Sequence, residues 1–176
     1  MAIIVETGGN IAGAESYESV ANATTYHAAR GNTSWAALAS DAVREQLLRK
    51  STDFIEQRYR LAWKGYRKYS DQALSFPREL VYLEPQANID LLLSNTIVPT
   101  EVKNACAELA LKASTYTDGL LPDVTDLITE ETIGPITTKY DKRSPVSPQY
   151  KAIDAMLAVY LKDGGMNSAT STVQRA

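Results

Sequence analysis

Three segments of the chain carry apolar residues at the three- and four-residue spacing of an amphipathic helix, and this pattern constrains the fold most. It predicts helices over residues 41–59, 99–119 and 147–163. A fourth, shorter helix is expected over residues 19–31, because Ser19 is a good N-cap and a glycine ends the segment. The sequence therefore predicts a mainly α fold, a small bundle of about four helices.

Two stretches between these segments interrupt the helical pattern. Residues 61–98 contain two prolines, Pro77 and Pro85, and indicate a long connection, with a short helix near Leu91. Residues 127–140 are rich in isoleucine and threonine and contain a Gly134-Pro135 break. This composition favours a β-hairpin or a bent β-ribbon. We expect extended arms at both ends of the chain.

The length and composition of the chain limit what it can be. Its 176 residues suit one domain, which we place at residues 1–163, followed by a polar tail at 164–176 that we expect to be disordered unless bound. One cysteine and one histidine exclude an internal disulfide and a cluster of Cys and His ligands for zinc. We expect Cys106, which lies within an apolar helix stripe, to be buried.

The sequence offers little support for catalysis. It has no glycine-rich phosphate-binding loop, and no nucleophile is tied to His27 by a recognisable motif. No apolar run approaches the roughly 18 residues that a membrane-spanning helix needs. We therefore expect no enzymatic activity, no cofactor, no metal site and no membrane contact.

The most informative feature for function is the uneven distribution of charge. Residues 57–70 carry five basic side chains and no acidic one, with aromatic residues between them. Such a segment suits single-stranded nucleic acid, because cations neutralise phosphates and aromatic rings stack on bases. It equally suits a protein interface, where arginine and tyrosine are enriched, and we favour that reading on composition alone. The candidate residues for either role are Arg58, Arg60, Trp63, Lys64, Arg67 and Lys68.

An ordered set of motifs resembles a family of tailed-phage proteins labelled DnaT-like single-stranded DNA-binding proteins. The motifs are SYESVANATTYHAARGNTSW, QALSFPRE, IVPTEVKNACAELALKA, TIGPITTKYD and AIDAMLAVYL. They span the chain from Glu6 to Leu161. The helix-plus-hairpin layout of that family is in turn similar to the head-to-tail connector (adaptor, head-completion) proteins of phage particles.

The connector resemblance implies a structural virion protein, and this is the function that we expect. It implies a homo-oligomeric ring, usually twelve-fold, that binds the portal and joins it to the next connector or tail component. Double-stranded DNA would pass through the ring without specific binding. The implied location is the virion neck, after assembly in the host cytoplasm. The alternative function is that of a single-stranded DNA-binding protein of phage replication. For portal docking, the candidate residues are Tyr150, Met156, Tyr160 and Met166.

Overall fold

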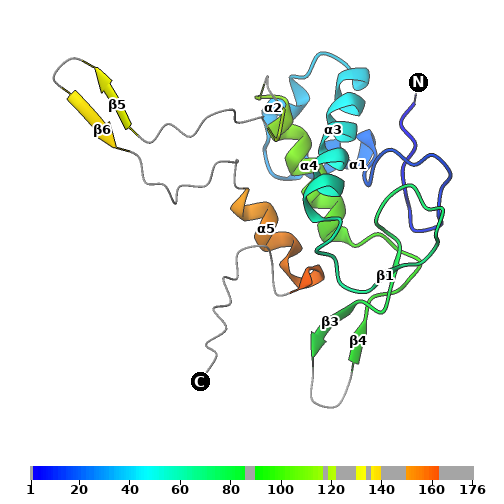
Figure 1. Cartoon of the computed structure of the whole chain (residues 1–176). Coiled ribbons are helices and arrows are strands. Elements are labelled where there is room, and N and C mark those ends of the chain that lie inside the picture. Colours follow the sequence, from blue (N-terminus) through cyan, green and yellow to red (C-terminus); the bar gives the residue numbers. More distant parts are fainter. Residues whose placement is uncertain are drawn as a thin grey trace, which may run out of the picture.

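The computed structural model describes residues 2–85, 90–116, 119–121, 130–133, 136–139 and 150–162 (Figure 1). It is mainly helical, as the sequence predicts. The helices are α1 (Val20–Ala29), α2 (Thr33–Ala36), α3 (Asp41–Tyr59), α4 (Thr100–Ala113) and α5 (Lys151–Leu157), and a 3₁₀ turn, η1 (Ala158–Tyr160), follows α5.

The centre of the fold is the packed pair α3 and α4 (Figure 1). The helix α4 can lie close to α3 because its buried stripe consists largely of alanines and Cys106. The thiol of Cys106 is fully buried and lies 3.1 Å from the hydroxyl of Ser51 and 3.3 Å from that of Thr52, both on α3. The predicted burial of Cys106 is therefore confirmed.

The helix ends agree with the sequence where the capping signals are strong. The hydroxyl of Ser19 accepts a hydrogen bond from the backbone N–H of Asn22, and the hydroxyl of Ser40 accepts one from Val43, which fixes the starts of α1 and α3. The helix predicted over 99–119 is shorter, because Pro99 is its N-cap and it ends at Ala113. The helix predicted over 147–163 shortens to α5 and η1, with residues 147–149 and 163 outside the described residues.

The strands form three two-stranded antiparallel pairs among the described residues. β1 (Tyr66–Arg67) pairs with β2 (Arg78–Glu79), and β3 (Tyr82–Pro85) pairs with β4 (Asp90–Leu92). β5 (Glu130–Ile133) pairs with β6 (Ile136–Lys139), in agreement with the predicted ribbon at about 127–140.

The short helix predicted near Leu91 is wrong, because Leu91 lies in β4. An apolar run of three residues is too short to separate a strand from a helix by its pattern. Here the run finds a strand partner in the segment just before it, so it forms a hairpin. The predicted connection over 61–98 therefore holds two hairpins.

A second part of the core lies where α3, the β1–β2 hairpin and η1 meet. Phe76 is fully buried, and its ring packs edge-on against the rings of Trp63, Tyr17 and Tyr160. A backbone bridge between Trp63 and Leu161 ties the C-terminal part of the described chain to the segment after α3. The predicted tail at 164–176 lies outside the described residues. No helix in the described part of the chain has the length and apolar character that crossing a bilayer requires.

Candidate nucleic-acid interface

The basic and aromatic segment 57–70 runs from the last turn of α3 into β1, and the structure divides its side chains into two groups. Trp63 belongs to the core. Its side chain is 0% exposed, and its ring centroid lies 5.0 Å from that of Phe76 and 5.8 Å from that of Tyr59. A ring in this position cannot stack on a base, so the assignment of Trp63 to an interface is inconsistent with the structure.

Two of the predicted arginines hold the fold together. Arg58 Nη2 lies 3.4 Å from both carboxylate oxygens of Asp154, a link between α3 and α5. The guanidinium of Arg67 donates to the backbone carbonyl of Gln72. The Nε atoms of both arginines are buried, without a hydrogen-bond partner in the described part of the protein. The charge of Arg58 is thus paired inside the fold, whereas Arg67 is half-buried and its acceptor is neutral.

Arg60, Lys64 and Lys68 keep their charge available at the surface. Arg60 is exposed at the C-cap of α3. The ammonium of Lys64 donates to the backbone carbonyl of Val159 at 2.8 Å, and that of Lys68 donates to the carbonyl of Asn95 at 3.0 Å. These acceptors are neutral, so the bonds position the ammonium groups without neutralising their charge. They remain able to pair with an anion.

A hollow of about 320 Å³ opens beside Lys64. Three of its lining side chains are large and exposed: Tyr66 (71%), Leu80 (53%) and Tyr82 (41%). Gly65 and Lys162 complete the lining. Sequence reasoning missed Leu80, Tyr82 and Lys162, because they lie far from residues 57–70 along the chain and no motif connects them.

Specific contacts bring these distant residues together. The ammonium of Lys64 lies 3.3 Å from the backbone carbonyl of Tyr82. The backbone N–H of Lys162 donates to Ala62, and its ammonium lies 3.5 Å from the carbonyl of Leu61. Two lysines therefore stand next to the hollow that the two tyrosines line. We use the name cationic–aromatic face for Lys64, Tyr66, Leu80, Tyr82 and Lys162, together with the surface cations Arg60 and Lys68 of the same basic segment.

A buried cation fixes the backbone under this face. Arg78 donates through Nε to the carbonyl of Lys64 at 2.7 Å and through Nη2 to that of Gly65 at 2.8 Å. Its burial lowers the pKa of the guanidinium below its usual value. Gly65 is required because its φ is +64° and a Cβ there would lie 2.0 Å from the carbonyl oxygen of Glu79.

Glu79 places an acidic side chain beside this arrangement. It lies opposite Tyr66 in the β1–β2 pair and is exposed. Its carboxylate accepts a hydrogen bond from the amide of Asn95 at 3.3 Å, and the same amide group accepts one from Lys68 at 3.2 Å. The asparagine thus separates Lys68 from this carboxylate.

Two of the residues predicted to dock on a portal, Tyr150 and Tyr160, are buried in the fold. Tyr150 is buried and donates to the carbonyl of Leu120 at 3.1 Å. Tyr160 is buried and donates to the carboxylate of Glu101 at 2.6 Å. Met156 is half-buried against the core, and Met166 lies outside the described residues. Side chains used in this way do not present a docking surface.

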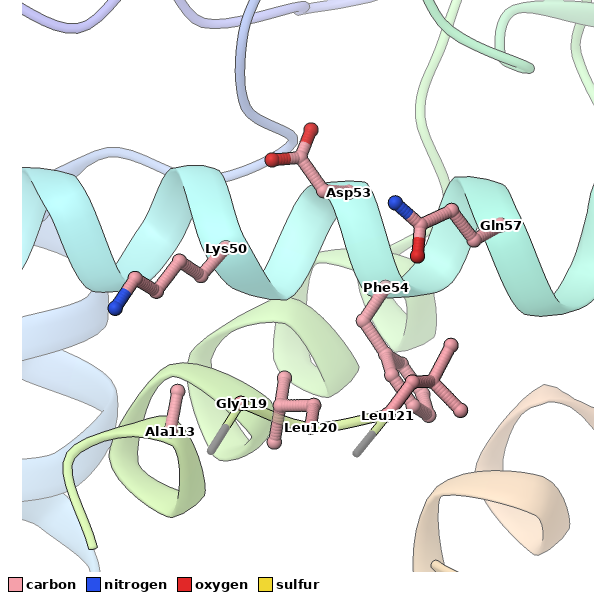
Figure 2. A pocket seen from close by; sticks show the side chains of 8 residues that line it. All are labelled: Lys50, Asp53, Phe54, Gln57, Ala113, Gly119, Leu120 and Leu121. Carbon is pink, nitrogen blue, oxygen red and sulfur yellow. The ribbon is translucent and has the colours of Figure 1, made fainter. Parts of the chain in front are cut away.

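A second hollow, of about 240 Å³, lies between α3 and residues 119–121. In Figure 2, Phe54 points from α3 toward Leu120 and Leu121, which form an apolar floor. Lys50, Asp53 and Gln57 line it from α3, so its charge is mixed. Burial raises the pKa of the Asp53 carboxyl, and the nearby carboxylates of Glu56 and Glu15 raise it further. The described residues contain no group of three or more His, Cys, Asp or Glu side chains placed to hold a metal ion.

Together, the fold and the cationic–aromatic face define a small helical protein with a surface suited to an anionic, base-bearing polymer. The chain belongs to the family described as "Putative DnaT-like ssDNA binding protein", whose model matches residues 1–176. No curated protein and no solved structure matches the chain.

The family match corrects the expected function. A head-to-tail connector that forms a ring on the portal is contradicted, because the family that covers the whole chain is described by single-stranded DNA binding. The expected partners are wrong for the same reason: the portal, the next connector and double-stranded DNA that passes without specific binding. The helix-plus-hairpin layout that suggested a connector is present, but such a layout does not determine function.

Proposed function

We propose that the protein binds single-stranded DNA through the cationic–aromatic face and performs no catalytic step. The observation that carries this proposal is the pair of surface cations Lys64 and Lys162 next to the exposed rings of Tyr66 and Tyr82, with Arg60 and Lys68 also at the surface in the same segment as Lys64. Membership of the DnaT-like family supports it independently. The localisation stays a prediction.

The chemistry of the face fits a single strand. Lysine and arginine neutralise phosphates and release counterions, which supplies most of the affinity for nucleic acid. Exposed aromatic rings add stacking with bases that a duplex keeps inside its helix. The formal net charge of the protein is −3, so binding depends on this local face and is expected to weaken steeply with salt.

The proposal is tested by reversing charges on the face and elsewhere. The double variant Arg60→Glu/Lys68→Glu changes two exposed or half-exposed cations of the face. The matched control Lys50→Glu/Lys151→Glu changes two exposed lysines, one in the middle of α3 and one at the start of α5. Both variants lower the net charge by the same amount.

Binding is measured by fluorescence anisotropy of a labelled oligo-dT across a salt series. The face variant is expected to bind at least tenfold more weakly, with a salt slope reduced by about 1.4, since each lost phosphate contact removes about 0.7 for a single strand. The control is expected to keep the full slope. Equal loss in the two variants, or equal affinity for duplex DNA or RNA of the same sequence, would overturn the proposal.

A further inference from the structure

We propose that the hollow between Tyr66 and Tyr82 seats one unstacked nucleobase of the bound strand. This inference rests on the proposed function and adds base recognition to it. Phosphate contacts alone would let the protein bind any polyanion. A site that holds a base makes the affinity depend on the bases as well.

The exposure of the lining residues is the first argument. Folding by itself favours burial of large apolar side chains, yet Tyr66, Leu80 and Tyr82 are 71%, 53% and 41% exposed around one hollow. The neighbouring Val81 and Phe76 are buried, so the same hairpins also supply core residues. An exposed aromatic group of this kind gives a flat base a surface on which to stack.

The backbone of Leu80 is the second argument. Leu80 has a φ of +55°, in the left-handed region that residues with a side chain beyond Cβ rarely adopt. Leu80 lies between β2 and β3. In this conformation its side chain is exposed, whereas the side chain of the next residue, Val81, is buried. Strained residues of this kind are concentrated at binding sites, where the strain sets a side chain in place.

The position of the cations is the third argument, and it identifies the occupant. Lys162 lines the hollow, and the ammonium of Lys64 contacts the backbone of Tyr82. A nucleotide bound here would place its base against the rings and its phosphate near these two lysines. An apolar peptide would leave both ammonium groups without an anionic partner.

The test separates bases from phosphates by comparing two ligands of equal length and charge. One is oligo-dT, and the other is a chain of abasic tetrahydrofuran sites. The variants Tyr66→Ala and Tyr82→Ala are compared with Tyr116→Ala, which removes an exposed tyrosine that follows α4. All three rings are exposed, so each variant is expected to keep its melting temperature.

Wild-type protein is expected to bind oligo-dT more tightly than the abasic chain. Tyr66→Ala and Tyr82→Ala are each expected to lose about 5- to 150-fold of the affinity for oligo-dT, the range that base–aromatic stacking supplies. Both are expected to leave abasic binding unchanged, while Tyr66→Phe and the control variant behave as wild type. Fluorescence of a 2-aminopurine base in the strand should be quenched by wild type and not by Tyr66→Ala.

A Leu80→Gly variant gives an independent readout, because glycine adopts a positive φ without strain. The variant is expected to unfold at the same or a higher temperature. It should bind oligo-dT more weakly and the abasic chain as tightly as wild type does. If wild type binds both ligands equally, the base seat is refuted while single-stranded binding stands. If it binds neither at low salt, the proposed function fails as well.

Discussion

Replacing Trp63 distinguishes a core residue from a base-stacking residue. The side chain is fully buried against Phe76 and Tyr59, and substitution of such a side chain by alanine costs about 3–5 kcal/mol. A domain of this size has a free energy of unfolding of roughly 5–15 kcal/mol, so Trp63→Ala should remove a large share of it. Unfolding in urea followed by far-ultraviolet circular dichroism measures this loss.

The conservative variant Trp63→Phe makes the test decisive for binding. It keeps an aromatic ring in the core and removes the indole Nε1, a buried donor without a partner among the described residues. We expect a smaller cost than for Trp63→Ala, because the phenyl ring fills most of the site, and unchanged affinity for oligo-dT. A tenfold loss of affinity with an unchanged urea midpoint would show that Trp63 touches the strand and would refute the division of this segment into core and face.

Three further predictions test the fold and the face. Asp154→Ala should lower the free energy of unfolding by about 2–4 kcal/mol. Arg58 loses its half-buried partner, and Tyr59 loses the acceptor of its 2.5 Å hydrogen bond. An unchanged urea midpoint would contradict this. Burial lowers the pKa of His27, so the unfolded chain takes up the proton first, and stability should fall as the pH drops below about 6.5. Urea midpoints at about pH 7.5 and 5.5 measure this fall, which His27→Gln should reduce; a flat profile in wild type would count against it. Glu79→Gln removes the carboxylate opposite Tyr66 and should tighten oligo-dT binding a few-fold at low salt, whereas weaker binding would place the carboxylate in a supporting role.

The helical part of the fold could be predicted from local signals. The bounds of α3 agree with the 41–59 pattern, because a serine cap and a long amphipathic stripe coincide there. The predictions for α4 and α5 were too long. The C-cap of α4 is Ser114, whose backbone N–H bonds back to the last turn, so the helix stops before Gly119, the end that the sequence predicts.

The binding face could be predicted only in part. Residues 57–70 supply Arg60, Lys64, Tyr66 and Lys68, so the charge pattern indicates part of the proposed face. It could not show that Trp63 points into the core, because a segment without regular periodicity carries no signal for which side chains are inside. The contributions of Tyr82 and Lys162 depend on long-range contacts that only the folded chain makes.

The function predicted from the sequence was wrong in its main reading. The same ordered motifs pointed to a DnaT-like family and, through a shared layout, to connector proteins, and the choice between them rested on composition. The acidic net charge is an average over the whole chain, and it does not reveal a local group of surface cations.

The buried thiol of Cys106 is a natural probe of local unfolding, because its labelling rate depends on how often the core opens. The thiol, on α4, contacts the hydroxyl groups of Ser51 and Thr52 on α3 and that of Ser16 in the segment before α1. Burial raises the pKa of the thiol, and a reagent in solution reaches it only when these parts separate. Because it is the single cysteine of the chain, the rate at which it is labelled in excess reagent reports how often the central helix pair comes apart. The same measurement with and without oligonucleotide would show whether binding at the proposed face slows that opening.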